Sequence, residues 1–320
     1  MRTILMVWRH HPITARQLAE VHAAAPGYGV VVASEAAEMD AVLDEVEIIA
    51  GRAPPDVLAR APRLRWYQQW DAGVDWLLSH PVLAQRDFLL TNSSGIHAIP
   101  LTEHILALML ALSRRLNEAW RAQGQRDWHT VPFGRTSELY GKTIVIVGMG
   151  PIGQRLAQVV AALGMRVVGV RSRAGIAVPG VERMWGPDGL LDALAEADWL
   201  VLAAPLTTRT RGLVGRRELA RIKPGAYLIN VGRGPVLDEA ALIDALQDGR
   251  LAGAALDVFE TEPLPPDSPL WDMPNVLITA HYAGDSPLYH ERALAIFLDN
   301  LERYVVGRPL RNLVDKQRGY

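Results

Sequence analysis

Three glycines within six residues have the spacing of a loop that binds a phosphate group. The segment Gly148-Met149-Gly150-Pro151-Ile152-Gly153 reads G-x-G-x-x-G, and it follows the apolar run 141–147 and precedes a helical pattern. The first glycine permits a tight turn, the second lets the backbone approach a pyrophosphate, and the third lets the helix pack closely on the strand. Pro151 suits a first helical turn, where free N–H groups attract an anion. The segment therefore predicts a dinucleotide-binding loop.

The residues about 20 positions further on bear on the choice of dinucleotide. Enzymes that use NAD usually have an acidic residue there, which binds the ribose 2′-hydroxyl. This chain has Val170-Arg171-Ser172-Arg173 instead. Two guanidinium groups with a hydroxyl could hold a 2′-phosphate. We predict NADP(H) as the preferred cofactor; use of NAD(H) is the alternative if the arginines only face solvent.

Strands and helices alternate along the chain in a way that predicts two α/β domains. The 320 residues suffice for two domains, and short apolar runs between amphipathic stretches predict parallel sheets covered on both faces. In the first part the expected strands are Ile4–Trp8, Val30–Ala33, Glu47–Ala50 and Arg65–Trp70, with helices at Ala15–Ala25 and Ala36–Val42. A second series of six strands is expected at 141–147, Met165–Val170, Trp199–Ala203, Tyr227–Asn230, Ala254–Asp257 and Val276–Thr279.

The expected fold class is α/β, with two Rossmann-like or flavodoxin-like parallel-sheet domains and a cleft between them. A final helix at Ser286–Tyr304 is expected to pack back onto the first domain. The predicted domains are residues 1–98 plus 285–320, for the substrate, and 99–284, for the dinucleotide. The stretch Thr102–Leu116 is apolar on nearly every side, which predicts a buried helix; a plain core and a subunit interface both fit it.

The composition argues against several classes of protein. A formal net charge of −2 does not favour nucleic acid or a membrane surface as a partner. Cysteine is absent, so we expect no disulfide and no thiolate metal site, and no metal site is predicted at all. The apolar part of Met1–Pro12 is too short for a signal peptide or a membrane span, so a cytoplasmic enzyme is expected.

Four motifs, taken in order, resemble those of the D-isomer-specific 2-hydroxyacid dehydrogenases. This family includes glyoxylate/hydroxypyruvate reductases and phosphoglycerate dehydrogenase. The resemblance covers most of the chain, and a weaker match is Ala72-Gly73-Val74-Asp75. The four motifs are GMGPIG at Gly148–Gly153, NVGRG at Asn230–Gly234, LDVFETEP at Leu256–Pro263 and TAHYAG at Thr279–Gly284.

The resemblance implies a reaction and a role for each site residue. Members of the family reduce a 2-keto acid to the D-2-hydroxy acid, or catalyse the reverse. By resemblance, Arg233 binds the substrate carboxylate and keto oxygen, His281 is the general acid, and Glu262 pairs with that histidine. The backbone of Ala72, Gly73 and Val74 holds the substrate carboxylate. The implied cofactor contacts, beyond the glycine loop and the arginine segment, are Ala204, Pro205, Thr210, Val231, Gly232, Asp257, His281, Ala283 and Gly284.

The chemistry of the three catalytic candidates agrees with these roles. Hydride transfer to a carbonyl leaves an alkoxide that needs a proton, and an imidazole exchanges protons near neutral pH. A neighbouring carboxylate favours the protonated ring, and an arginine grips a carboxylate with two parallel hydrogen bonds. Spacing does not separate Glu262 from Glu260; only the Glu-Pro pattern of the family selects Glu262. Ala280 stands where the family often has proline, which could relax the loop that carries His281.

Several alternatives stay open. A phosphite-type dehydrogenase on the same fold would also use Arg, Glu and His, and a nucleotide-sensing binding protein would use the same glycine loop. Glyoxylate, hydroxypyruvate, pyruvate and phenylpyruvate all remain candidate substrates. The resemblance further implies a homodimer that forms through the helix at Leu101–Leu116.

Overall fold

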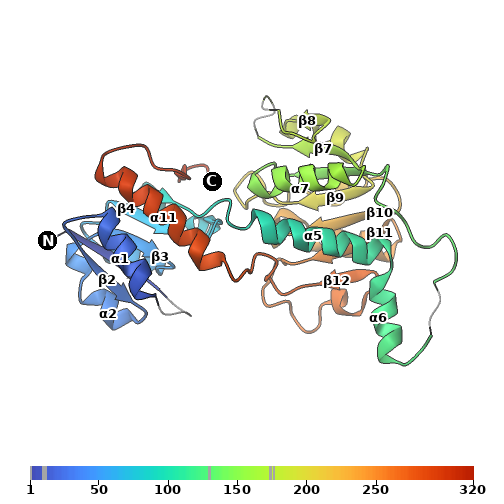
Figure 1. Ribbon diagram of the computed structural model, residues 1–320. Helices are drawn as coiled ribbons and strands as arrows, with labels where there is room; N and C mark the ends of the chain where they lie inside the picture. The colour runs from blue at the N-terminus through green and yellow to red at the C-terminus, as the bar shows by residue number, and fades with distance from the viewer. Residues whose placement is uncertain (1, 9–12, 129–130, 173–174, 176) are drawn as a thin grey trace. The chain divides into compact units, whose positions relative to one another are not determined.

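The computed structural model describes residues 2–8, 13–128, 131–172, 175 and 177–320. The chain divides into two compact units (Figure 1). Unit 1 consists of Met1–Ile96 and Ser286–Tyr320, and unit 2 of His97–Asp285. Unit 1 is thus formed by both ends of the chain, while unit 2 is one continuous stretch.

Unit 1 is built on a five-stranded parallel sheet with the strand order β2-β1-β3-β4-β5. This is the order of flavodoxin-like folds. The carboxyl ends of its strands share one edge, and the loop Ala72–Val74 follows the carboxyl end of β4. The strands are β1 (Arg2–Val7), β2 (Tyr28–Ala33), β3 (Val46–Gly51), β4 (Trp66–Gln69) and β5 (Leu89–Thr91).

Helices cover both faces of this sheet, as the apolar runs of its strands require. On one face, α1 (Ala15–Ala24) and α11 (Tyr289–Val305) pack against each other (Figure 1). Phe297 of α11 is fully buried, with its ring 5.6 Å from that of Trp66 and 5.7 Å from that of Trp70. These contacts fix the C-terminal helix onto the N-terminal sheet. The other face packs against α2 (Ala36–Asp40), α3 (Pro55–Arg60) and α4 (Pro81–Gln85).

Unit 2 is built on a seven-stranded parallel sheet with the order β12-β11-β10-β9-β6-β7-β8. The six strands β6 to β11 have the order of the doubly wound dinucleotide fold, and β12 extends the sheet beyond β11. The strands are β6 (Thr143–Val147), β7 (Arg166–Val170), β8 (Arg183–Trp185), β9 (Trp199–Leu202), β10 (Ala226–Asn230), β11 (Leu251–Leu256) and β12 (Val276–Ile278).

The helices of unit 2 form one layer on each side of the sheet. The first layer is α5 (Ala98–Ser113) beside α7 (Pro151–Ala162) (Figure 1). The second comprises α8 (Leu190–Leu194), α9 (Arg216–Leu219) and α10 (Glu239–Gln247). Residues that alternate along each strand enter the two cores separately, so Ile144 and Ile146 pack with α5 and α7, and Val145 and Val147 with the opposite layer.

The sequence prediction was wrong in its strand counts and in the length of one helix. It missed β5 and β8, because three residues are too few to give a visible apolar period. The long helix predicted to reach Leu116 ends at Ser113. Arg115 has φ +56°, a left-handed conformation, and a new helix, α6 (Leu116–Gly124), begins after it. The Arg115 guanidinium donates to the Arg135 carbonyl at 2.8 Å, which stabilises this break.

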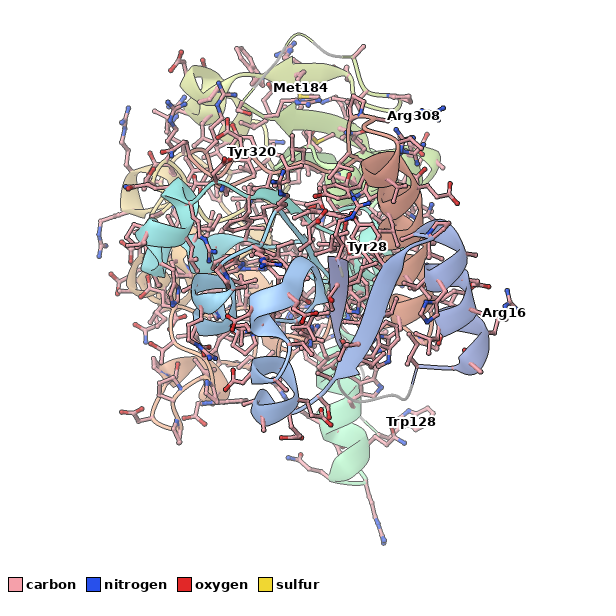
Figure 2. The ribbon with its side chains drawn as sticks, turned by 90° about the vertical axis from the view of Figure 1, so that its left-hand side faces the viewer. Arg16, Tyr28, Trp128, Met184, Arg308 and Tyr320 are labelled. Carbon is pink, nitrogen blue, oxygen red and sulfur yellow. The ribbon has the colours of Figure 1, made fainter. Side chains whose placement is uncertain are left out.

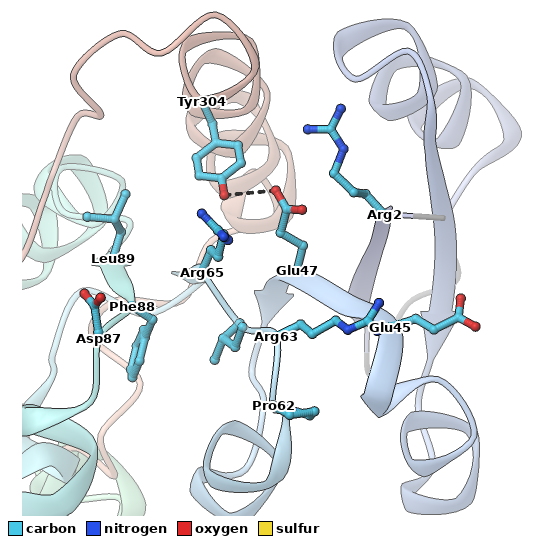
Figure 3. Close-up of a pocket in the computed structure, with 11 residues that line it drawn as sticks. Arg2, Glu45, Glu47, Pro62, Arg63, Arg65, Asp87, Phe88, Leu89 and Tyr304 are labelled. Carbon is cyan, nitrogen blue, oxygen red and sulfur yellow. Dashed lines mark hydrogen bonds between the residues drawn. The ribbon is translucent and has the colours of Figure 1, made fainter.

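A cavity of about 730 Å³ lies at the amino ends of the strands of unit 1 (Figure 3). Its wall includes Glu47, whose carboxylate accepts from Tyr28 at 2.7 Å and from Tyr304 at 3.1 Å. Burial and the hydrogen bond with Glu47 raise the pKa of Tyr28 to about 12. Ligands of open parallel sheets bind beyond the carboxyl ends, so this cavity lies at the edge opposite to the loop Ala72–Val74. Within the described ranges, no helix is long and apolar enough to cross a membrane.

Candidate active site

The glycine loop joins β6 to α7, and its three glycines meet different surroundings. A Cβ on Gly148, which has φ +105°, would lie 2.5 Å from the Ala203 carbonyl carbon, and one on Gly153 would lie 2.3 Å from the Gly148 oxygen. A Cβ on Gly150 would meet nothing within 4 Å. The first and third glycines are therefore required by packing, while the second borders open space. No side chain caps the first turn of α7, which leaves N–H groups for an anion.

The segment predicted to bind the ribose 2′-phosphate lies at the carboxyl end of β7, which pairs with β6. Arg171 is half-buried, and its backbone N–H donates to the Trp185 carbonyl at 3.1 Å. Ser172 is exposed. Arg173 lies outside the residues that the structure describes. No acidic residue directly follows β7 in the sequence. Arg171 and Ser172, on which the predicted preference for NADP(H) rests, both lie at the carboxyl end of this strand.

The turn that carries Arg233 is fixed by buried groups. The Asn230 side chain accepts from the Gly232 N–H at 3.1 Å and donates to the Arg233 carbonyl at 3.2 Å. A Cβ on Gly234 would lie 1.8 Å from the Phe259 carbonyl oxygen. The Arg233 guanidinium donates to the Gly232 carbonyl at 2.8 Å. The glycines of NVGRG thus let this turn approach the next loop, and the amide of Asn230 holds it there.

Glu262 and His281 form a direct pair. Glu262 Oε2 lies 2.7 Å from His281 Nδ1, and Glu262 Oε1 accepts from the Phe259 N–H at 3.0 Å. Because the carboxylate only accepts, Nδ1 carries a hydrogen and Nε2 is the ring atom left for a substrate. Glu260 has another position: its side chain accepts from the Glu239 N–H at 3.4 Å, at the start of α10. Of the two glutamates that spacing did not separate, Glu262 is thus the one in contact with His281.

His281 has an unusual backbone that the surrounding loop supports. Its φ is +54°, which costs about 1–3 kcal/mol for a residue with a side chain. The His281 N–H donates to the Asp257 carbonyl at 2.9 Å. Asp257 is 2% exposed, and its carboxylate accepts from Thr279 Oγ1 at 2.6 Å and from the N–H groups of Tyr282 and Ala283, each at 3.2 Å. One buried acid therefore organises the loop Thr279–Gly284.

The loop after β9 is a compact turn held by its own hydroxyl groups. Thr210 Oγ1 donates to the Pro205 carbonyl at 2.6 Å, and it accepts from the Thr207 N–H at 2.8 Å. Ala204 and Thr207 are buried. Val231, directly after β10, is also buried, and its N–H donates to the Leu202 carbonyl of β9 at 3.1 Å. Internal hydrogen bonds thus define the shape of the loop after β9.

All of these groups lie at one edge of the sheet of unit 2. They follow the carboxyl ends of β6, β7, β9, β10, β11 and β12, where ligands bind in open α/β sheets. The structure thus brings the predicted cofactor loop, Arg233, Glu262 and His281 to the same side of one sheet.

In unit 1, the loop Ala72–Val74 is tied to its sheet, since the Ala72 carbonyl accepts from Asn92 at 2.7 Å. Sequence reasoning missed a neighbouring cluster. Arg52, directly after β3, donates to Asp71 at 2.7 Å and to the Tyr289 hydroxyl at 3.2 Å. Burial and the adjacent Asp71 raise the pKa of Tyr289. The position of Arg52 after a strand was the only available signal; its partners are far away in the sequence.

Comparisons with known proteins agree with these observations. The family described as "D-isomer specific 2-hydroxyacid dehydrogenase, NAD binding domain" matches residues 106–283. A glyoxylate reductase from Aeropyrum pernix is 36% identical over 296 residues, which cover 89% of this chain and 85% of that protein.

Two solved structures resemble the whole chain. A D-isomer specific 2-hydroxyacid dehydrogenase from Xanthobacter autotrophicus Py2, in complex with NADPH and MES, is 33% identical with a TM-score of 0.85 and covers 100% of this chain and 99% of its own. An NADPH-dependent glyoxylate/hydroxypyruvate reductase from Sinorhizobium meliloti, in complex with NADP and sulfate, is 30% identical with a TM-score of 0.84 and covers 100% of both chains.

Proposed function

This chain belongs to the D-isomer-specific 2-hydroxyacid dehydrogenase family. On that premise we propose that it reduces a small 2-keto acid to the D-2-hydroxy acid and catalyses the reverse reaction. We propose NADP(H) as its preferred cofactor. The family assignment makes it an NAD(P)-dependent dehydrogenase; the residue roles, the substrate and the cofactor preference are the proposal. The observation that carries it is the 2.7 Å contact between Glu262 and His281.

His281 is the proton donor in the direction of reduction. When bound, the nicotinamide supplies a hydride to the carbonyl carbon of the substrate. The developing charge on the keto oxygen takes a proton from His281 Nε2. Glu262 accepts from Nδ1 and so holds the ring in one orientation, and its negative charge stabilises the imidazolium before the proton leaves. In the direction of oxidation the same Nε2 takes the proton from the hydroxyl group.

Arg233 binds the substrate and polarises its carbonyl group. A guanidinium presents parallel N–H donors that match a carboxylate, and a further donor can contact the keto oxygen. The turn at Asn230–Gly234 supports this role because the Asn230 side chain fixes the backbone that carries Arg233. The backbone of Ala72, Gly73 and Val74 is proposed to hold the substrate carboxylate as well.

The fit of the cofactor rests on unit 2. The open space at Gly150 and the uncapped first turn of α7 suit a pyrophosphate. Arg171 and Ser172 suit a 2′-phosphate, and no acid at this point would repel one. The remaining proposed contacts are Ala204, Pro205, Thr210, Val231, Gly232, Asp257, Ala283 and Gly284. The complexes of the two structural relatives with NADPH and NADP support the preference.

Glyoxylate and hydroxypyruvate are the first substrates to test, because relatives with those names match this chain. The experiment follows the absorbance of reduced nicotinamide with purified enzyme, NADPH or NADH, and a panel of 2-keto acids. Oxidation of NADPH by at least one of them supports the proposal, and the ranking names the substrate. Faster oxidation of NADH would refute the preference. Absence of oxidation with every keto acid would favour phosphite oxidation or a nucleotide-sensing role.

We further propose the homodimer that the resemblance implies, through the stretch predicted as one helix at Leu101–Leu116; the structure ends α5 at Ser113, and α6, which follows, extends the proposed interface. Several large apolar side chains are exposed in this region, and Trp128 is 94% exposed and stands clear of the ribbon (Figure 2). Leu116 and Trp120 lie four residues apart in α6 and so share one face of that helix, and an exposed apolar face marks an interaction site. The exposed side chains are Leu116, Trp120, Trp128, Phe133 and Tyr140. Light scattering should give the mass of two chains, and Trp128→Glu should shift it toward one.

A further inference from the structure

Two histidines that the mechanism does not use, His97 at the N-cap of α5 and His104 within it, contact the two ends of the loop Thr279–Gly284. His97 Nδ1 lies 3.1 Å from the Gly284 carbonyl oxygen, and His104 Nε2 lies 3.1 Å from Thr279 Oγ1. Residues seven apart lie two turns along one face of a helix. A Cβ on Gly284 would lie 2.9 Å from His97 Nδ1, so the loop approaches the helix closely there.

The hydrogen atoms at His104 can be assigned from its partners. Asp257 accepts from Thr279 Oγ1 at 2.6 Å and from two backbone N–H groups, which marks its carboxylate as an acceptor. The single hydroxyl hydrogen of Thr279 therefore points at Asp257, and its oxygen must accept from His104. His104 Nε2 consequently carries a hydrogen. Burial lowers the pKa of His104, so the ring is the neutral Nε2–H tautomer at neutral pH.

The chain of donors runs from α5 to the backbone on which His281 sits. His104 donates to Thr279, Thr279 to Asp257, and the Asp257 carbonyl accepts from the His281 N–H. His281 needs such support, because its φ of +54° is strained. The residue before it is Ala280, which lacks the ring that would restrict the backbone of a proline.

We propose that His104 is a positioning residue for the reaction: its Nε2–H orients Thr279 and, through Asp257, holds the loop that presents His281. This inference rests on the proposed role of His281. His104 touches neither substrate nor cofactor in this scheme. A misplacement of the proton donor by about 1 Å can cost on the order of 10²-fold in rate, so a smaller loosening of the loop should lower kcat while it leaves substrate binding largely intact.

The test removes the donor and then restores it. His104→Leu, which keeps an apolar side chain without a donor, should lower kcat for keto-acid reduction by roughly tenfold with little change in KM. His104→Gln, which can donate from a side-chain amide, should recover most of the loss. Thr279→Val should reproduce His104→Leu, and the two together should cost no more than either alone. Glu103→Gln, one residue away on an exposed position of α5, is the matched control and should behave as wild type.

A second comparison separates positioning from general damage. In the His281→Ala background, where no proton donor remains to be positioned, His104→Leu should have no further effect on the residual kcat. An equal loss in both backgrounds, or no rescue by glutamine at matched thermal stability, would overturn the inference. If His104→Leu does not fold, the same comparison with Thr279→Val decides. Normal turnover of His281→Ala alone would instead refute the proposed function, so the two failures are distinguishable.

Discussion

Glu262 Oε2 lies 2.7 Å from His281 Nδ1, although the two residues come from loops that follow different strands, β11 and β12. The other Glu262 oxygen accepts from the Phe259 N–H at 3.0 Å, so the carboxylate is held from both sides. The pair leaves His281 Nε2 as the ring atom that can exchange a proton with a ligand.

Removal of this ring should abolish most of the turnover. His281→Ala should lower kcat by about 10²–10⁴-fold, the usual contribution of a positioned acid. Glu262→Gln, which keeps an oxygen near Nδ1 but loses the charge, should cost less. Steady-state kinetics with NADPH checks both, and quenching of protein fluorescence by NADPH shows whether the cofactor still binds. Turnover near that of wild type in His281→Ala would refute the assignment.

Arg233→Lys should separate charge from geometry. Lysine keeps the positive charge but loses the planar fork that binds a carboxylate with two hydrogen bonds. We expect kcat/KM for the keto acid to fall on the order of 10²-fold, with a rise in KM and a fall in kcat, because binding and polarisation are both weakened. Arg217→Lys, on an exposed position of α9, is the control. Equal losses in the two variants would contradict the proposed role.

The cofactor preference should respond to the charge at the end of β7. Arg171→Asp removes a partner for the 2′-phosphate and adds a repulsive charge, so the ratio of kcat/KM for NADPH to that for NADH should fall. Arg221→Asp makes the same charge change at an exposed site away from β7. If the ratio of kcat/KM for NADPH to that for NADH stays at the wild-type value in Arg171→Asp, another residue determines the cofactor preference.

The stability of the enzyme should depend on pH through His104. Burial lowers the pKa of this ring below its ordinary value near 6.5. As pH falls below about 6.5, the unfolded chain takes up a proton at this position and the folded chain does not, so its contribution is present above that pH and lost below it. The wild-type urea midpoint should therefore fall more steeply than that of His104→Gln between about pH 7.5 and 5. Parallel curves would mean that the ring titrates normally.

Two substitutions in the glycine loop should have opposite consequences. Gly153→Ala places a Cβ 2.3 Å from the Gly148 carbonyl oxygen, so it should lower stability by about 1–3 kcal/mol. Gly150→Ala meets nothing within 4 Å and should fold normally, but its methyl group would occupy space proposed for the pyrophosphate. Thermal melts and KM for NADPH measure the two effects. The reverse pattern would remove the argument for a phosphate at Gly150.

The sequence predicted most reliably what depends on neighbours in the chain. The roles of Gly148 and Gly153 follow from a local turn between a strand and a helix, so their motif sufficed to predict the loop. The choice between Glu260 and Glu262 did not follow, because both lie in one segment and only the fold brings α10 to one and His281 to the other.

Contacts between distant segments could not be predicted in this way. His104 reads as one more residue of an apolar helix, and its partner Thr279 is 175 positions away. The short strands β5 and β8 form because longer neighbours offer a sheet edge, which no window of three residues reveals. Arg52 and Tyr289 meet across 237 positions of the chain.

The division of the chain into one continuous unit and one unit formed by both ends has a consequence for how its sequence can change. Arg233, Glu262, His281 and the glycine loop are all encoded in the one uninterrupted stretch His97–Asp285, whereas the other unit is assembled from the two flanks. A substitution in either flank leaves these proposed reacting groups unchanged, although the N-terminal flank carries the proposed substrate contacts Ala72, Gly73 and Val74. The flanks can therefore alter those proposed substrate contacts while the stretch that carries the proposed proton donor keeps its sequence.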